Sequence, residues 1–134
     1  MNPISFERFI KPLLPFLFGS WMIIVLYLTI APPVMIKTAS TIIHPGLGHV
    51  ILFGGWTLLL GFTLLINLDK KDLSLLVLWV SGILFGAFIE LMQYIMPFGR
   101  SGSFLDIGLN TIGCTIAVYI LAGYRKIREP YLTD

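Results

Sequence analysis

Residues 73–96 read LSLLVLWVSGILFGAFIELMQYIM, an apolar run in which Glu90 is the only charged residue. A run of this length is sufficient for an α-helix to cross a hydrocarbon core of about 30 Å. A carboxylate inside that core costs about 3 kcal/mol on insertion scales, so it is expected to have a partner or a task. The run therefore predicts a membrane-spanning helix with a polar site near its end.

The composition places the whole chain among membrane proteins. It has 134 residues, of which 57% are hydrophobic and 12% charged, and its mean hydropathy is +0.91. Ordinary globular domains contain about twice that share of charged residues. We expect one domain over residues 1–134, with a core of about residues 13–124. A net charge of +2 predicts no nucleic-acid partner. The lone cysteine, Cys114, is interpreted as a small core residue.

Four apolar runs predict an all-α fold with four transmembrane helices in one bundle. These runs are Leu13–Ile30, Leu47–Leu68, Leu73–Met96 and Phe104–Tyr124. Backbone groups in lipid must be satisfied within the segment, which favours helices. The runs lack the alternation of barrel strands.

Lys and Arg residues predict the orientation of this bundle. Seven of them flank the side that holds both termini: Arg8, Lys11, Lys70, Lys71, Arg125, Lys126 and Arg128. Only Lys37 and Arg100 flank the other side. We therefore expect both termini in the cytoplasm. Glu90 then lies about 9 Å inside the outer end of its helix, because six residues of helical rise separate it from Met96.

Further polar residues are predicted to gather with Glu90 at the outer end. They are His49, Gln93, Arg100, Ser103, Asp106 and Asn110. Gln93 is three residues after Glu90, a spacing that shares a helix face. Ser103 and Asp106 form an S-x-x-D pattern, so Ser103 is expected to begin the last helix. We expect no comparable polar group at the inner end.

These residues have a structural and a functional interpretation. Glu90 could pair with Arg100 to fix the packing, or it could act as a proton carrier, a general base or a ligand contact. Arg100 could be a loop cation at the headgroups, or bind a phosphate or carboxylate. Asp106 and Asn110 are expected to hydrogen-bond between helices, although Glu90 and Asp106 could also act as acid and base. His49 is interpreted as a satisfied core or interface residue, with the alternatives of a catalyst or, together with Glu90 and Asp106, a metal ligand.

No nucleophile motif accompanies these residues, so we expect no catalytic residue, no cofactor and no metal. Gly82 and Gly86 form a G-x-x-x-G pattern, which permits close approach of a neighbouring helix. That helix could belong to the same bundle or to another subunit.

The spacing of the polar residues resembles the signature of the VanZ-like membrane proteins. The pattern is Glu90-x-x-Gln93, then Pro97-x-x-Arg100-x-x-Ser103-x-x-Asp106-x-x-x-Asn110-x-x-Gly113. His49 matches a histidine that many relatives carry at the start of the second helix. Pro45 and Gly46 stand where those relatives have Asp and Lys.

The resemblance implies a multi-pass protein of the bacterial cytoplasmic (inner) membrane. The founding member of the family is associated with low-level resistance to teicoplanin, a glycopeptide antibiotic. One hypothesis is that the outward polar cluster binds an anionic envelope lipid or peptide. The alternative is a non-catalytic accessory subunit of a larger membrane complex. An enzyme acting on an envelope lipid would require the cluster to line an open, water-filled cavity. The expected partners are membrane lipids and other membrane subunits.

Overall fold

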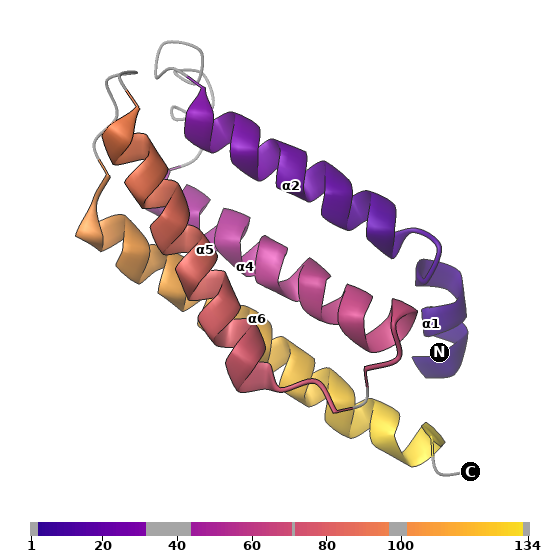
Figure 1. The fold of residues 1–134 in the computed structure, drawn as a ribbon. Helices are drawn as coiled ribbons and strands as arrows, with labels where there is room; N and C mark the ends of the chain where they lie inside the picture. Colours follow the sequence, from indigo (N-terminus) through magenta and orange to yellow (C-terminus); the bar gives the residue numbers. More distant parts are fainter. Residues whose placement is uncertain (1–2, 32–43, 71, 97–101, 133–134) are drawn as a thin grey trace.

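The computed structural model describes residues 3–31, 44–70, 72–96 and 102–132, and in these ranges the chain is helical without strands. The elements are α1 (Pro3–Ile10), α2 (Leu14–Ile30), α4 (Pro45–Phe62), the π-helical turn η1 (Thr63–Asn67), α5 (Leu75–Ile95), α6 (Phe104–Arg128) and the 3₁₀ turn η2 (Glu129–Leu132). The predicted all-α fold is confirmed (Figure 1).

Three helical stretches are long and apolar enough to cross a membrane. They are Gly46–Asn67, Leu75–Ile95 and Phe104–Tyr131. The first predicted run corresponds to α2, which has 17 residues. It meets α1 at a bend of 61°. The chain therefore has three candidate spans, or four if the bent pair counts as one, which makes it a multi-pass membrane protein.

Local sequence signals set the helix ends. Ser74 and Ser103 are the N-caps of α5 and α6, and each side chain accepts a backbone N–H of the first turn. His44 caps α4, and its Nδ1 accepts the N–H of Gly46 at 3.2 Å. These caps satisfy amide groups that have no partner within the helix. The prediction that Ser103 begins the last helix is confirmed.

Helix α4 lies between α2 and α6 and makes its most extensive contacts with α6 (Figure 1). The two backbones approach closely where Gly54 of α4 faces Gly113 of α6. A Cβ atom on Gly54 would lie 2.9 Å from the Gly113 carbonyl oxygen. A Cβ atom on Gly113 would collide with the carbonyl oxygen of Val50. The absence of side chains at both glycines thus sets the spacing of α4 and α6.

Two buried apolar clusters hold the helices together. The first joins Leu14, Leu65, Ile66, Leu78 and Leu121. The second joins Val25, Phe53, Ile89 and Cys114, and Trp21, Leu52, Trp79 and Phe85 pack against it. Cys114 is fully buried and accepts a hydrogen bond from the Thr57 hydroxyl at 3.2 Å. The interpretation of Cys114 as a core residue is confirmed.

A buried polar group lies at the end of the bundle that holds α1 and the C-terminal end of α6. The sequence predicted no such group at this end, so that prediction was wrong. We call Glu7, Asp69, Tyr124 and Arg128 the Arg128 cluster. Arg128 donates to both carboxylate oxygens of Glu7, at 2.5 and 3.2 Å, and to Asp69 at 3.3 Å. The Tyr124 hydroxyl donates to Glu7 at 2.7 Å. These bonds fasten α1 to the C-terminal end of α6.

Candidate functional site

Four polar side chains from three helices meet at the opposite end of the bundle. We call His49, Glu90, Asp106 and Asn110 the Glu90 cluster. His49 lies near the start of α4 and Glu90 near the end of α5, while Asp106 and Asn110 lie one turn apart near the start of α6. The helical spacing and the antiparallel course of α5 and α6 bring them together.

Glu90 is buried, with 3% of its surface exposed. Its Oε2 accepts the backbone N–H of Ser103 at 3.1 Å. Its Oε1 lies 3.5 Å from Nδ1 of His49. Among the described residues, no hydrogen-bond partner satisfies Oε1. Glu90 is therefore fixed through one oxygen, while no residue that the structure describes donates a hydrogen bond to the other.

His49 is oriented by Asn110, whose Oδ1 lies 3.0 Å from Nδ1 of the ring. Because a carbonyl oxygen only accepts, this bond places a hydrogen on Nδ1 and leaves Nε2 free of hydrogen in the neutral ring. Nε2 lies 3.8 Å from Oδ1 of Asp106. The ring also stacks against Phe53, with centroids 6.3 Å apart. In this tautomer, His49 presents the lone pair of Nε2 toward Asp106.

The connection into α6 passes very close to α5. A Cβ atom on Gly102 would lie 2.5 Å from the carbonyl oxygen of Glu90. Glycine therefore permits the approach that lets the next residue, Ser103, donate its N–H to Glu90. In a capping box, a residue of the same helix accepts that N–H. Here Glu90 of α5 supplies the acceptor, so the cap of α6 also positions Glu90.

Gly82 and Gly86 pack inside the bundle. A Cβ atom on Gly82 would lie 2.5 Å from the Thr57 hydroxyl, and one on Gly86 would lie 3.0 Å from Nδ2 of Asn110. The predicted packing face thus meets α4 and α6 of the same chain.

Asn110 is fully buried beside Glu90. Its Nδ2 has no hydrogen-bond partner among the described residues.

Two predicted members stand apart from the Glu90 cluster. Gln93 is buried on the same helix face, but its amide donates to the carbonyl of Thr29 in α2 at 3.0 Å. It therefore joins α5 to α2. Arg100, the predicted partner of Glu90, lies outside the described residues. Within the described ranges, no Lys or Arg pairs with Glu90 or Asp106, and the basic side chain beside both carboxylates is the imidazole of His49.

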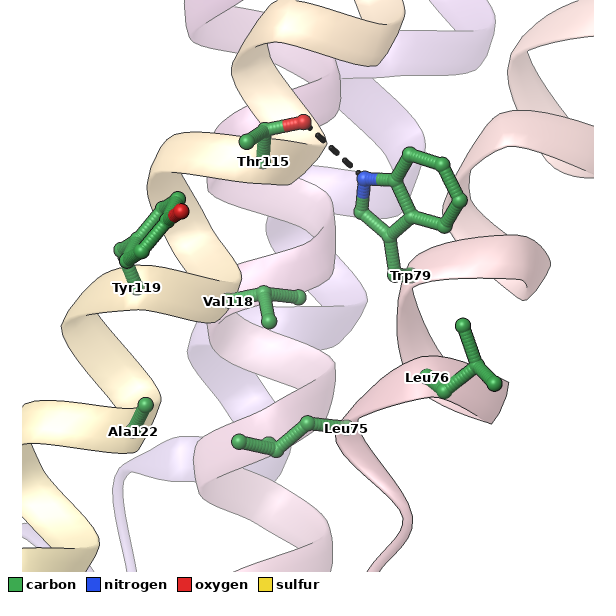
Figure 2. Close-up of a pocket in the computed structure, with 7 residues that line it drawn as sticks. All are labelled: Leu75, Leu76, Trp79, Thr115, Val118, Tyr119 and Ala122. Atoms are coloured by element: carbon green, nitrogen blue, oxygen red, sulfur yellow. Dashed lines mark hydrogen bonds between the residues drawn. The ribbon is translucent and has the colours of Figure 1, made fainter.

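An apolar groove of about 280 Å³ runs between α5 and α6 (Figure 2). Its lining comprises Leu75, Leu76, Trp79, Thr115, Val118, Tyr119 and Ala122. The Trp79 indole donates to the Thr115 hydroxyl at 3.0 Å across one end of the groove (Figure 2). This hydrogen bond satisfies the indole, and the surrounding apolar side chains suit an acyl chain or a neighbouring helix rather than chemistry.

The sequence did not predict the Arg128 cluster, nor the hydrogen bond from Gln93 to the carbonyl of Thr29. Glu7 and Arg128 are separated by 121 positions, and Gln93 and Thr29 by 64. A signal existed for the first contact, because Glu7 is an acid in an apolar N-terminal stretch and Arg128 follows the last apolar run. Helical spacing identifies the face of a residue but does not identify the helix opposite it.

The fold and these contacts define a class: a multi-pass helical membrane protein with a buried, incompletely paired polar cluster at one end of its bundle. The chain belongs to the VanZ/LLP1 family, whose model matches residues 8–125. The match includes both polar clusters except Glu7 and Arg128. Searches of curated proteins and of solved structures found no match.

Proposed function

We propose that this protein crosses the bacterial cytoplasmic membrane four times, as one VanZ-like unit with both termini in the cytoplasm. The distribution of Lys and Arg supports this orientation. The bent pair α1 and α2 supplies the first span. The Glu90 cluster then opens toward the outer face, and the Arg128 cluster lies on the cytoplasmic side.

In this arrangement the Glu90 cluster binds the polar part of an anionic envelope lipid or peptide, and this binding underlies tolerance to teicoplanin. The observation that carries the proposal is the buried Oε1 of Glu90, which has no hydrogen-bond partner among the described residues. Helices that used the cluster only for packing would satisfy this oxygen, since an unpaired buried acceptor costs about 1–3 kcal/mol. An incompletely paired cluster favours binding over packing alone.

Arg100 is the residue that we assign to the anion. Glu90 and Asp106 are acidic and repel a phosphate or carboxylate, whereas a guanidinium matches both groups with paired N–H donors. Arg100 precedes the N-terminus of α6 by a few residues. Helix N-termini favour negative charge as well. The anionic group is therefore expected beside the N-terminus of α6.

Teicoplanin tolerance tests this function directly. The chain is expressed in a susceptible bacterium, and the minimal inhibitory concentration is compared between variants with equal membrane levels. Arg100→Ala and Glu90→Gln should return tolerance to the level of empty vector. Lys37→Ala is the matched control, because it removes the other basic residue of the proposed outer side, and it should retain tolerance. Wild-type tolerance in both test variants would reject the binding site.

The second candidate is a non-catalytic accessory subunit of a membrane complex. The α5–α6 groove supports it, because exposed side chains such as Tyr119, 76% exposed, surround an apolar recess. Gly82 and Gly86 do not support it, because they pack within the chain. Purification in mild detergent should then retain a stoichiometric partner. Ala122→Trp in the groove should release it, whereas Ile120→Trp should not. A chain that purifies alone would exclude this candidate.

A further inference from the structure

We propose that the Glu90 cluster binds a divalent transition-metal ion of the Zn²⁺ type, with His49, Glu90 and Asp106 as ligands. Each of these residues offers one ligand atom, and the three atoms all lie within 4.8 Å of one another. Ligands placed about 2.1 Å from a tetrahedral zinc ion lie about 3.5 Å apart. The sequence led us to expect no metal, and this grouping is the reason for proposing one.

Oε1 of Glu90 is an independent indication of a cation, because no hydrogen-bond partner reaches it in the part of the chain that the structure describes. Oε1 is buried, and the contact of Oε2 with the Ser103 N–H fixes the carboxylate in place. A buried anionic oxygen is expensive without a hydrogen bond or a positive charge. Nδ1 of His49 lies 3.5 Å away and is already engaged by Oδ1 of Asn110. A metal ion would supply the missing partner.

The surrounding contacts are those that orient metal ligands. Ligating histidines usually donate their second ring N–H to an oxygen, which fixes the tautomer and aims the other nitrogen at the ion. The contact between Nδ1 of His49 and Oδ1 of Asn110 does this and leaves Nε2 facing Asp106. The N-cap amide of Ser103 does the same for Glu90.

Charge and access also suit a dication. Two carboxylates and a neutral imidazole carry a charge of −2, which one divalent ion neutralises. The imidazole nitrogen favours Zn²⁺ and similar ions over Mg²⁺ or Ca²⁺, which prefer oxygen ligands. Asp106 is 27% exposed and His49 19%, so an ion could enter beside them. Three protein ligands leave a fourth position open. This inference holds whether or not the proposed anionic ligand exists.

Zinc binding to the purified full chain tests the proposal. The protein is prepared in detergent with an affinity tag that contains no histidine, stripped with a chelator, and titrated with Zn²⁺ against a fluorescent chelator. We expect one ion per chain. Asp106→Asn and His49→Gln should weaken binding about 100-fold or more, and Asn110→Ala about 10-fold, since loss of an orienting contact typically costs 10–100-fold.

The controls use the same residue types at exposed positions. His44→Gln and Asp72→Asn should bind Zn²⁺ like the wild-type chain. Helical circular dichroism establishes that each variant is folded, and Asp106→Asn affects a partly exposed residue that is least needed for packing. The visible spectrum of Co²⁺ in the wild-type chain reports tetrahedral coordination without any substitution. Less than one ion per chain, or equal binding by Asp106→Asn and Asp72→Asn, would overturn the proposal. Neither result bears on teicoplanin tolerance, which is measured separately.

Discussion

The two polar clusters contain similar residues but differ in how completely they are paired. In the Arg128 cluster, both carboxylate oxygens of Glu7 accept hydrogen bonds, from Arg128 and from Tyr124. In the Glu90 cluster, Oε1 of Glu90 has no hydrogen-bond partner among the described residues, and the two contacts of His49 with the carboxylates measure 3.5 and 3.8 Å. Burial alone therefore does not distinguish a carboxylate used for packing from one used for binding. The distinguishing feature is whether both carboxylate oxygens accept hydrogen bonds.

This difference has an energetic consequence. Removing one partner of a closed, buried ion pair leaves the other charge uncompensated and is strongly destabilising. Removing the charge from an incompletely paired carboxylate also removes a desolvation penalty, so the two effects offset. The same substitution, Glu to Gln, should therefore have very different effects on stability at the two ends of the bundle.

Glu7→Gln should have the largest effect on stability. The amide loses an acceptor oxygen and places an NH₂ group against the guanidinium of Arg128, which is 6% exposed. We expect the free energy of unfolding to fall by about 3 kcal/mol. The measurement is helical circular dichroism during titration from a mild detergent into sodium dodecyl sulfate.

Glu129→Gln is the control for this prediction, because Glu129 directly follows Arg128 in the chain and its side chain is exposed. It should change the free energy of unfolding by less than about 0.5 kcal/mol. Equal effects of Glu7→Gln and Glu129→Gln would show that the Arg128 cluster is not a structural lock.

The sequence predicted the helices better than their partners. Apolar runs identified α4, α5 and α6 because the length needed to span a membrane is a property of each segment alone. The first run, Leu13–Ile30, matches α2 to within one residue, but α2 has only 17 residues and is a candidate span only together with α1, across a bend of 61°. The π-helical turn at Thr63–Asn67 has no counterpart in the hydropathy pattern.

For the candidate site too, the sequence predicted the level of each residue in the bundle better than its contacts. Helical spacing and the antiparallel order placed His49, Glu90 and Asp106 at one level, and the structure brings them together. The spacing also placed Gln93 beside Glu90, yet its amide reaches Thr29 in α2. The three-residue step rotates Gln93 far enough to face another helix, and only packing determines which helix that is.

Gly113→Ala should have an intermediate effect on stability, and of the two polar clusters it should disturb only the Glu90 cluster. The added methyl group would collide with the carbonyl oxygen of Val50 and push α4 away from α6. Overpacking of this kind should lower the free energy of unfolding by about 2 kcal/mol. It should also weaken Zn²⁺ binding, because His49 is one residue before Val50.

Gly108→Ala is the matched control, since an added Cβ at this exposed α6 glycine meets nothing within 4 Å. There alanine should stabilise the helix by about 0.5–1 kcal/mol. Titration of both variants into sodium dodecyl sulfate measures the difference. If both alanines are tolerated equally, the close approach of α4 and α6 does not position the Glu90 cluster.

Glu90→Gln should have the smallest effect on stability, but it should abolish Zn²⁺ binding. The amide oxygen of Gln can still accept the N–H of Ser103, so the cap of α6 is retained. The loss of a buried charge offsets the loss of the contact with His49, and the free energy of unfolding should change by less than about 1 kcal/mol. Unfolding curves and Zn²⁺ titrations on the same preparation measure both quantities. A loss of stability equal to that of Glu7→Gln would mean that Glu90, like Glu7, fastens helices together. If Glu90→Gln keeps its stability but no longer binds Zn²⁺, the charge of Glu90 is needed for the ligand and not for packing.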